Sequence, residues 1–464
     1  MPHSTFHRRQ FLRAVTACGT GGALVPYWLT ARTSRGSETG SKNDRPRIGA
    51  VGVGSQGMGI ARQAAQFGHI VAVCDADLQH AERAKAAFGG KADVYQDYRR
   101  LLDRNDIDIV TNGTPDHWHT AINIAACQSG CDVYAEKPLT LTIDEGKLLR
   151  QVVEESGRIV QVGTQHRSNR FCQTAVELVR NGRLGKLRQV WVAVPYLSTK
   201  GGPFASQPVP PHLDWDLYQG QAPEHDYRPE RTHRNFRWWY EYSGGMATDW
   251  GNHYVDIAHW GMDCEGTGPV SIEARGIFPN PPDPRYFNTA DRFFSRMMYP
   301  SGVELLFFTS LAERMNFAGR TGHEPSTPEQ IEQLFGTDAP EEAKTLDRSG
   351  IMFIGDRGRI IVNPGGVYGR PAEELAENPL PADAWRAYPS GNHMANFFEC
   401  TRTREQPCAP VDVEHRTMTA CHLTNIAMRL GRKLTWDPEA EAIVGDDEAD
   451  AWQRYEQRAP YTLA

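Results

Sequence analysis

The chain contains two short apolar runs separated by a glycine-rich turn and a segment with helical spacing. The first run covers residues 48–53, the helical segment 58–67 and the second run 70–74, after which Asp75 follows. Short apolar runs rich in β-branched residues are typical of buried strands. The pattern therefore predicts a strand, a turn, a helix and a second strand that ends in an acidic residue.

The alternation of strand-like and helix-like segments continues to about residue 165. We expect strands at 94–95, 107–110, 132–135 and 158–162, and helices at 81–88, 98–102 and 142–155, together with one that ends at Gln128. Strands that alternate with helices at this spacing predict an α/β fold with a doubly wound parallel sheet. Ligands of such sheets bind beyond the carboxyl ends of the strands.

The pattern changes beyond residue 165. An irregular stretch at 199–242 is rich in Pro, Trp and Tyr, and an ordered loop of that length is usually functional. The other expected elements are helices at 171–181, 246–262, 392–402 and 413–430, and strands at 188–195, 270–278, 293–299, 303–309, 351–354 and 359–362. These runs fit a mainly antiparallel sheet, and the polar residues 324–348 are expected to be an insertion.

The N-terminal segment carries a targeting pattern rather than a folding pattern. Arg8 and Arg9 precede Phe11-Leu12, and a Gly/Ala-rich, mildly apolar run follows. This resembles a twin-arginine export signal, which we place at 1–33 with a linker at 34–45, and it predicts a periplasmic protein. The run is too short and glycine-rich for a strong membrane span, so no stable membrane insertion is expected after signal removal. A basic tail and lipidation at Cys18 are the alternatives.

Size, charge and cysteine content narrow the class of protein. A chain of 464 residues is long enough for at least two domains, which we place at 46–165 and 166–464. The net charge of −7 argues against a nucleic-acid partner. Nine cysteines are scattered, and the closest pair, Cys127 and Cys131, lacks the flanks of a zinc ribbon. We therefore expect neither a metal nor a disulfide framework.

The glycine-rich turn is the fingerprint of a dinucleotide site. Gly52 allows a tight turn, Gly54 lets the backbone approach a pyrophosphate, and Gly57 lets the helix lie close to the strand. Ser55 and Gln56 lie in the same turn, where helix N–H groups would meet the phosphates. Asp75 would bind the ribose hydroxyls and repel a 2′-phosphate, so NAD is favoured over NADP. An ordinary turn that binds nothing is the alternative.

Five loops should meet at one cleft, because each follows the carboxyl end of an expected strand. Beyond the glycine turn and Asp75, the predicted cofactor contacts are Thr114, Pro115, His119, Glu136, Lys137 and Gln165. His119 and its neighbour Trp118 could pack against the cofactor, and core packing is the alternative for Trp118.

Several motifs together resemble one family. The glycine fingerprint, residues 114–119 (TPDHWH), Glu136-Lys137-Pro138 and Asp249-x-x-x-His253 occur in the order of the Gfo/Idh/MocA family of glucose–fructose oxidoreductases and inositol dehydrogenases. The likeness covers nearly everything from Arg47 onward and is nearest to an exported bacterial branch. It implies a Rossmann domain followed by an α/β domain with a large open sheet, often used to form a homodimer or homotetramer. It also implies NAD(P)-linked hydride transfer on a carbohydrate or cyclitol.

The resemblance assigns catalytic roles to Lys137, Asp249 and His253. Oxidation of a secondary alcohol needs a hydride acceptor and a proton acceptor, and imidazole titrates near neutral pH. Lys137 could stabilise a developing alkoxide, and Asp249, one turn before His253, could orient the imidazole or contact a substrate hydroxyl. Which of Lys137 and His253 is the base stays open, and taken singly each of the three could be structural.

Substrate contacts are expected around this group. Candidates are Arg167, Trp238, Trp250 and Asp256, with the basic and aromatic residues 231–242 as a cleft wall. An ion pair would explain Arg167 equally well, and helix polarity would explain Asp256. A metal held by Asp249, His253 and Asp256 is a further alternative that we do not adopt, since a redox cofactor already explains these residues.

The sequence thus predicts an exported oxidoreductase that transfers a hydride between a sugar, sugar derivative or cyclitol and a tightly held NAD. One alternative is an NAD-dependent glycosidase or lyase that oxidises its sugar transiently. Another is a non-catalytic module that binds NAD or a sugar.

Overall fold

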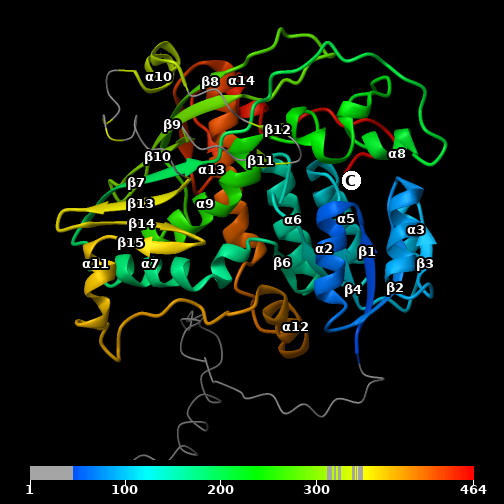
Figure 1. Ribbon diagram of the computed structural model, residues 1–464, viewed down its shortest axis with the longest axis horizontal. Coiled ribbons are helices and arrows are strands. Elements are labelled where there is room, and N and C mark those ends of the chain that lie inside the picture. The colour runs from blue at the N-terminus through cyan, green and yellow to red at the C-terminus, as the bar shows by residue number, and fades with distance from the viewer. Residues whose placement is uncertain are drawn as a thin grey trace, which may run out of the picture. The chain divides into compact units, whose positions relative to one another are not determined.

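The computed structural model describes residues 45–310, 316–317, 320–321, 326–336, 340, 342 and 349–463 (Figure 1). The predicted export signal and all but Arg45 of the linker lie outside these residues, as does much of the predicted insertion. Within the described part, no helix is long and apolar enough to cross a membrane.

The first half of the described chain forms a six-stranded sheet in the order β3-β2-β1-β4-β5-β6, and every neighbouring pair is parallel. The strands are β1 (Arg47–Val51), β2 (His69–Cys74), β3 (Asp93–Tyr95), β4 (Ile109–Asn112), β5 (Asp132–Ala135) and β6 (Val160–Val162). The helices between them are α2 (Ser55–Ala64), α3 (Leu78–Ala87), α4 (Tyr98–Leu102), α5 (His119–Gln128) and α6 (Ile143–Ser156), with the 3-10 turn η2 (Asp116–Trp118) before α5. The predicted doubly wound parallel sheet is confirmed.

Side-chain caps determine where these helices start. Asp77 accepts a hydrogen bond from the N–H of Gln79 at the start of α3, and Thr142 caps α6 in the same way. Helix α2 begins at Ser55, three residues before the predicted start, and its N-cap Gly54 offers no side chain. The first N–H groups of α2 therefore remain available to a ligand.

A nine-stranded sheet dominates the second half, in the order β15-β14-β13-β7-β10-β9-β8-β16-β17. Only β7 and β10 pair in parallel, so the predicted mainly antiparallel sheet is confirmed for the described residues. Its strands are β7 (Leu187–Val194), β8 (Ser271–Ile277), β9 (Arg292–Met298), β10 (Glu304–Thr309), β13 (Gly350–Gly355), β14 (Arg359–Asn363), β15 (Gly366–Tyr368), β16 (Leu434–Asp437) and β17 (Ala442–Ile443). A separate two-residue pair joins β11 (Asn316–Phe317) to β12 (Arg320–Thr321).

Both faces of this sheet are apolar. Along β10, Leu305 and Phe307 belong to the main core, whereas Leu306 and Phe308 belong to a second cluster on the other face. Helices α7 (Arg170–Arg180), α9 (Met246–Met262) and α13 (Val411–Leu430) contact the strands on the first side, and α10 (Pro328–Phe335) adds Leu334 and Phe335 to the second cluster. The remaining helices are α8 (Trp215–Gln219), α11 (Arg370–Glu373), α12 (His393–Thr403) and α14 (Asp447–Ala451), with 3-10 turns η3 (Gln165–Ser168), η4 (Pro229–Arg231), η5 (His233–Trp238) and η7 (Glu374–Ala376).

Residues 195–245, here called the crossing segment, leave β7 and pass over the carboxyl ends of the Rossmann strands (Figure 1). Backbone hydrogen bonds hold the segment there, from Leu78 N–H to His212 O (2.8 Å) and from Asp214 N–H to Ala76 O (2.9 Å). The long irregular stretch of the sequence is thus an ordered cover that contains only short helices.

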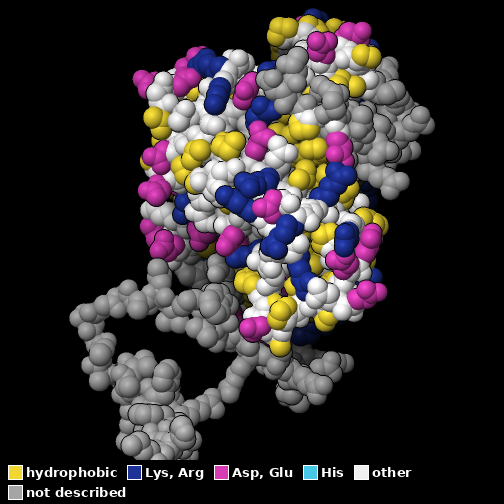
Figure 2. Space-filling view, turned by 90° about the vertical axis from the view of Figure 1, so that its left-hand side faces the viewer, with side chains coloured by type: hydrophobic (Ala, Val, Ile, Leu, Met, Phe, Trp, Pro, Cys, Tyr) yellow, Lys and Arg dark blue, Asp and Glu magenta, His cyan; other side chains and the backbone are white. Residues whose placement is uncertain are grey.

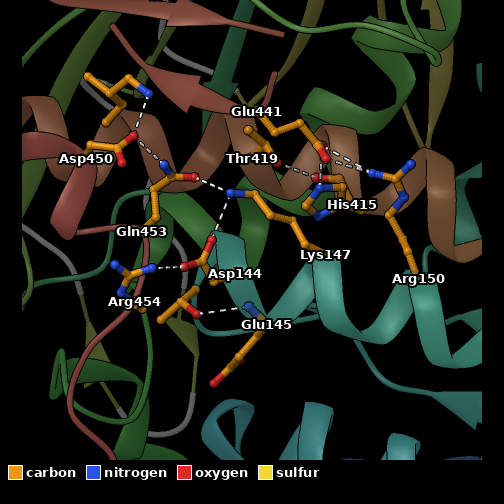
Figure 3. A network of polar contacts seen from close by, with 12 residues as sticks. Asp144, Glu145, Lys147, Arg150, His415, Thr419, Glu441, Asp450, Gln453 and Arg454 are labelled. Carbon is orange, nitrogen blue, oxygen red and sulfur yellow. Dashed lines mark hydrogen bonds and ion pairs between the residues drawn. The ribbon is translucent and has the colours of Figure 1, made fainter. Parts of the chain in front are cut away.

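A polar network ties the C-terminal residues back to α6 (Figure 3). Lys147 donates to Asp144 and to the side-chain oxygen of Gln453, both at 2.8 Å, and Arg454 donates to Asp144 at 3.1 Å. Within the same network, His415 of α13 contacts Glu441 at 2.7 Å. The end of the chain therefore braces the Rossmann helix that packs against α5 and α13.

The face shown in Figure 2 carries acidic and basic side chains side by side, with hydrophobic side chains between them. Exposed ion pairs of this kind include Arg359 with Glu342 and Arg370 with Glu374. This face is therefore not the continuous basic surface that a nucleic-acid partner would need.

Candidate active site

A cleft of about 360 Å³ lies where the carboxyl ends of the Rossmann strands meet the crossing segment. Its floor is formed by the loops after β1, β2, β4 and β5, and its cover by α8 and η5. Of the predicted site residues, the following line it: Gly52, Gly54, Ser55, Gln56, Asp75, Thr114, Pro115, Glu136, Lys137 and Asp249. Four of the five strand ends predicted to converge therefore meet at one cleft, and the fifth, at Gln165, does not line it.

The three glycines of the turn differ in what surrounds them. Gly52 has φ +71°, and a Cβ there would lie 2.4 Å from the backbone nitrogen of Thr114. A Cβ on Gly57 would lie 1.7 Å from the carbonyl oxygen of Gly52, so only glycine lets the helix pack this closely. At Gly54 the nearest atom would be 3.6 Å away, on His80, which leaves the backbone open to the cleft. These environments match the predicted roles of turn, packing and pyrophosphate approach.

Asp75 is held rigidly at the end of β2. Its Oδ2 accepts the N–H of Val53 at 3.0 Å, and its Oδ1 accepts the N–H of Asp77 at 2.9 Å. The carboxylate is thus fixed next to the glycine turn, where a ribose would lie when a dinucleotide phosphate occupies the N-terminus of α2. Aromatic residues line this end of the cleft, namely Tyr98, Trp118 and Tyr218.

Trp118 and His119 are neighbours in the sequence but have different positions at the cleft. Trp118 lines the cleft although it is only 5% exposed, and its indole N–H donates to Leu217 O at 3.0 Å. His119 lies behind the cleft wall, with Nδ1 2.6 Å from Pro138 O and Nε2 2.9 Å from Thr114 O. The imidazole therefore joins two loops of the cleft, and a positioning role replaces the predicted cofactor contact in this structure.

Glu136 is buried at the end of β5 and organises its neighbours. Its side chain accepts the N–H of Lys137 at 3.0 Å and the amide N–H groups of Gln56 (3.2 Å) and Gln165 (3.4 Å). Burial raises the pKa of Glu136 above its ordinary value, against the opposing charge of Lys137. Gln165 itself does not line the cleft, so it reaches the site only through Glu136.

Lys137 and Asp249 form an ion pair inside the cleft. The Nζ of Lys137 donates to Oδ1 of Asp249, and Nε of Arg237 donates to Oδ2 at 3.2 Å. Burial opposes ionisation of Asp249, but the charges and hydrogen bonds of Lys137 and Arg237 lower its pKa to about 2. The cluster thus holds an ammonium and a guanidinium around one carboxylate, an arrangement suited to an oxygen that gains negative charge.

His253 follows Asp249 by one turn of α9 but does not touch it. The carboxylate of Asp249 is occupied by Lys137 and Arg237, and Nδ1 of His253 is buried without a hydrogen-bond partner. The ring stacks on His166 with centroids 4.6 Å apart. Burial, together with the nearby charges of His166 and Lys137, lowers the pKa of His253 well below its ordinary value, so the ring is neutral at pH 7. A neutral imidazole can accept a proton, yet His253 lies behind the cleft lining.

Asp116 is a cleft residue that the sequence analysis did not single out. It is 4% exposed and lies on η2, within the TPDHWH segment, at the end of the cleft that holds Asp249. Burial raises the pKa of Asp116 to about 7, and the negative charge of Asp249 adds to the effect. Two carboxyl groups with widely separated pKa values therefore share this end of the cleft, which is typical of acid–base sites. Its place in the loop that follows β4 was the signal that could have identified it.

The predicted substrate contacts fall outside the cleft lining. Arg167 pairs with Asp256 at 2.6 Å and with Glu265 at 2.7 Å, and its guanidinium lies 4.9 Å from the ring centre of Trp260. The structure thus shows the ion pair that was the alternative for Arg167. Because Asp256 is engaged in this pair, it is not available to bind a metal together with Asp249 and His253. The physical reason is that both side chains are fully enclosed, at 3% and 0% exposure.

The aromatic wall is formed by other members of the 231–242 stretch. Trp238 is buried at 2% exposure and Trp250 packs edge-on against His253, and neither lines the cleft. The cleft instead receives His233, Arg234, Phe236 and Arg237 from η5. Sequence spacing could not separate them, because a 3-10 turn alternates its faces differently from a helix or strand.

The eight described cysteines are all buried and free, and none forms a disulfide. This agrees with the prediction for these residues.

A glycine turn, a fixed acid and a charged pair around one cleft define a nicotinamide-dependent oxidoreductase by class. Profiles of the Gfo/Idh/MocA family match in two parts, "Oxidoreductase family, NAD-binding Rossmann fold" at residues 47–164 and "Oxidoreductase family, C-terminal alpha/beta domain" at 191–281 and 379–463. The chain belongs to this oxidoreductase family, and its first domain is the NAD-binding Rossmann domain.

Curated relatives cover part of the chain. A glycosyl hydrolase family 109 protein of Shewanella sp. (strain W3-18-1) is 31% identical over 207 aligned positions, which cover 39% of this chain and 44% of that protein. An alpha-N-acetylgalactosaminidase of Shewanella oneidensis is 29% identical over 205 positions, with 39% and 44% covered. The chain thus spans less than half the length of these relatives.

Solved structures show the same fold at low identity. The WlbA dehydrogenase of Bordetella pertussis, in complex with NADH and UDP-GlcNAcA, aligns with a TM-score of 0.58 and 19% identity over 85% of this chain and 99% of that chain. The aldose-aldose oxidoreductase of Caulobacter crescentus aligns with a TM-score of 0.58 and 18% identity over 84% and 99%. A myo-inositol 2-dehydrogenase of Lactobacillus plantarum aligns at 0.55 and 16% over 84% and 99%.

Proposed function

We propose that the protein transfers a hydride between a hydroxyl-bearing carbon of a sugar, sugar derivative or cyclitol and a tightly held NAD. The observation that supports this most strongly is the Lys137–Asp249–Arg237 cluster, which shares one cleft with the glycine turn and Asp75. Proteins with the same fold include sugar and inositol dehydrogenases.

When bound, NAD would be held by the glycine turn, the N-terminus of α2 and Asp75, and it would supply the hydride acceptor. The chain's own residues supply the rest of the chemistry. Lys137 would donate a hydrogen bond to the reacting oxygen and stabilise its negative charge, while Asp249 keeps the ammonium in place. Lys137 and His253 are the two candidates for the group that takes the proton, and His253, which is neutral at pH 7, has a free lone pair to accept it.

Export would make cofactor retention a requirement. If residues 1–33 direct the protein to the periplasm, as the twin arginine at Arg8 and Arg9 suggests, a freely exchanging dehydrogenase would lack a soluble NAD pool. The cover formed by the crossing segment supports retention, because Leu217, Tyr218 and Phe236 line the cleft opposite the Rossmann loops. A retained NAD would be reduced and reoxidised on the same chain, by a second sugar or by return of the hydride.

A glycosidase is the second candidate. It is favoured by the relatives that are named as glycosyl hydrolase family 109 proteins. Transient oxidation of a glycoside would acidify a neighbouring C–H, and loss of that proton with elimination would expel the aglycone. Addition of water to the resulting double bond would complete the hydrolysis, and return of the hydride to the carbonyl would restore the alcohol and NAD. A non-catalytic NAD- or sugar-binding module is the third candidate, and the charged cluster in the cleft speaks against it.

The site is tested with Lys137→Met and its control Lys433→Met, which alters an exposed lysine beyond α13. The enzymes are mixed with NAD, a panel of sugars and cyclitols, and aryl glycosides of the same sugars. We expect Lys137→Met to lose at least about 100-fold in hydride transfer while it still binds NAD, and Lys433→Met to match the wild type. Equal turnover in all three proteins would refute the site.

The same panel separates the two reactions. Net NADH formation from a free sugar, or oxidation of one sugar with reduction of another, supports the oxidoreductase. Release of aryl alcohol without net NADH supports the glycosidase. Binding of NAD without either signal supports the non-catalytic module.

We further propose a homodimer or homotetramer built through the open sheet. The edge strand β15 leaves Tyr368 55% exposed, and Ile361 and Met298 add apolar surface on the same sheet. Light scattering of the purified protein tests this, and a monomer at micromolar concentration would contradict it.

A further inference from the structure

Three histidines surround one carboxylate oxygen at the rim of the cleft. The Oδ2 of Asp77 lies 3.6 Å from Nε2 of His233, 3.8 Å from Nε2 of His212 and 3.9 Å from Nε2 of His80. The ligand atoms of Asp77, His80 and His233 all lie within 4.8 Å of one another, and no other set of three or more such residues in the described part of the chain does so. His80 and His233 also line the cleft.

These separations are too long for hydrogen bonds, which span about 2.7–3.2 Å between nitrogen and oxygen. They are close to the spacing of ligands around a metal ion. Zinc bonds nitrogen and oxygen at about 2.0–2.1 Å, so two ligands of a tetrahedral ion lie about 3.4 Å apart. Imidazole and carboxylate are ligands that such an ion accepts.

Other contacts already orient the ligand atoms toward one point. Asp77 uses Oδ1 to cap α3 by accepting the N–H of Gln79 at 2.9 Å, which leaves Oδ2 facing the imidazoles. His80 places Nδ1 3.3 Å from Oδ2 of Asp75, which leaves Nε2 facing Asp77. A carboxylate that holds the second nitrogen of a histidine is the usual support of a metal-binding imidazole.

The four residues come from two parts of the fold. Asp77 and His80 belong to the first turn of the Rossmann helix α3, and His212 and His233 belong to the crossing segment. His233 has φ 51°, a left-handed backbone that is unfavourable for a residue with a side chain. Such strain persists where surrounding contacts impose it, and it is frequent at ligand clamps.

We propose that Asp77, His80 and His233 bind one zinc-type divalent ion that fastens the crossing segment to the Rossmann domain beside Asp75. His212 is the fourth ligand: its Nε2 lies 3.8 Å from the same oxygen but outside the 4.8 Å group, and its Nδ1 contacts the amide of Gln79 at 3.3 Å, which leaves Nε2 on the side of Asp77. The ion would close the adenosine end of the cleft. Bound NAD should then dissociate more slowly. This consequence rests on the proposed function, whereas metal binding does not.

The site revises the expectation that no metal binds. The sequence analysis considered cysteine pairs and the Asp249 helix, but these ligands are separated by more than 130 positions between His80 and His212. Backbone hydrogen bonds, among them Leu78 N–H to His212 O and Asp214 N–H to Ala76 O, bring the two parts together.

Metal binding is tested on the full chain, purified with a tag that contains no histidine. The protein is stripped with a chelator and titrated with Zn²⁺ by calorimetry, and Co²⁺ is used to record the absorption of a four-coordinate ion. His233→Asn is the main variant, because asparagine tolerates the left-handed backbone and should preserve the fold. His80→Gln and His212→Asn test the other imidazoles, and His69→Asn, at the opposite end of β2, is the control.

We expect one Zn²⁺ per wild-type and per His69→Asn chain. Affinity should fall at least about 10-fold in His233→Asn and in His80→Gln, with a smaller or equal loss in His212→Asn. Wild-type affinity in His233→Asn and His80→Gln, or no saturable Zn²⁺ binding by the wild type, would overturn the metal site. Either result would leave hydride transfer in the sugar panel as a separate question.

The clamp is tested by the rate at which bound NAD dissociates into excess unlabelled NAD. We expect the zinc-loaded wild type to release NAD at least about 10-fold more slowly than the stripped protein, with no zinc effect in His233→Asn. Zinc binding with unchanged NAD release would keep the site and overturn the clamp.

Discussion

At the scale of single residues, the site consists of charged side chains that are largely buried, although charged groups are more stable in water. Lys137 and Asp249 lie 112 positions apart in the sequence, yet they share an ion pair enclosed by the fold. Family motifs pointed to both residues, but nothing in the spacing indicated that they contact each other. Arg237 lies in the stretch predicted as a cleft wall and Asp116 in the TPDHWH segment, but neither was singled out, because a partner across the cleft cannot be found from local pattern.

Asp75 should determine the choice between NAD and NADP. Replacing it with Ala removes a charged acceptor of the ribose hydroxyls, and such hydrogen bonds contribute about 1.5–3 kcal/mol each. In Asp75→Ala we expect NAD affinity to fall at least about 10-fold, with a smaller change for NADP, measured by fluorescence titration. The control is Asp103→Ala, an acid with a 71% exposed side chain. An unchanged ratio of the two affinities would show that Asp75 does not contact the ribose.

Asp116 should make the stability of the protein depend on pH. Its folded pKa of about 7 is above the ordinary carboxyl value, so its stabilising effect is complete below the unfolded pKa and is lost as pH rises through about 7. From about pH 4 to about pH 7, the free energy of unfolding of Asp116→Asn should therefore rise by about 3 kcal/mol relative to wild type.

Urea unfolding of both proteins across this range measures the difference. Other buried acids with raised pKa values, such as Glu145, contribute equally to both proteins and cancel. A difference that stays constant with pH would mean that Asp116 is ionised in the folded protein.

At the scale of elements, the regular parts of the fold were predictable and the irregular parts were not. Helix α9 was predicted at its observed bounds, because its apolar residues recur at helical spacing from Met246 to Met262. Helix α10 was missed inside a segment taken for an insertion, although Thr327-Pro328-Glu329-Gln330 is the signature of a capping box. Strands β16 and β17 were missed because two- to four-residue strands depend on their neighbours rather than on their own sequence.

Two glycines of α2 offer a matched test of the dinucleotide turn. Gly57→Ala would place a methyl group 1.7 Å from Gly52 O, whereas an added Cβ at Gly59 meets nothing within 4 Å. We expect Gly57→Ala to lose NAD binding and about 2–4 kcal/mol of stability, and Gly59→Ala to gain up to about 1 kcal/mol. Thermal unfolding with and without NAD measures both. Equal stability of the two variants would show that the helix does not need the close approach.

The buried pair between η3 and α9 offers a second test at this scale. Arg167→Leu would leave the enclosed carboxyl group of Asp256 without its partner, and loss of one partner of a buried pair typically costs about 3–5 kcal/mol. The double variant Arg167→Leu with Asp256→Leu should recover much of that loss, as read by chemical denaturation. If Arg167→Leu instead kept its stability and lost only sugar turnover, the original prediction of a substrate contact would be favoured.

At the scale of the whole molecule, the crossing segment is the connection between the two domains that bears on the cleft. The crossing segment leaves the second sheet, covers the dinucleotide cleft and returns to α9, which carries Asp249. The family resemblance predicted both domains, but the sequence could not show that the irregular segment lines one side of the cleft, since its contacts join residues far apart in the chain.

The central claim is that NAD is held in this cleft and works without leaving it. The most direct measurement uses protein purified without added cofactor, which is denatured so that the NAD and NADH in the supernatant can be counted. We predict about one nicotinamide per chain for the wild type and much less for Asp75→Ala, in line with a closed cleft over Asp75. Wild-type protein that is empty and does not bind added NAD would contradict the account.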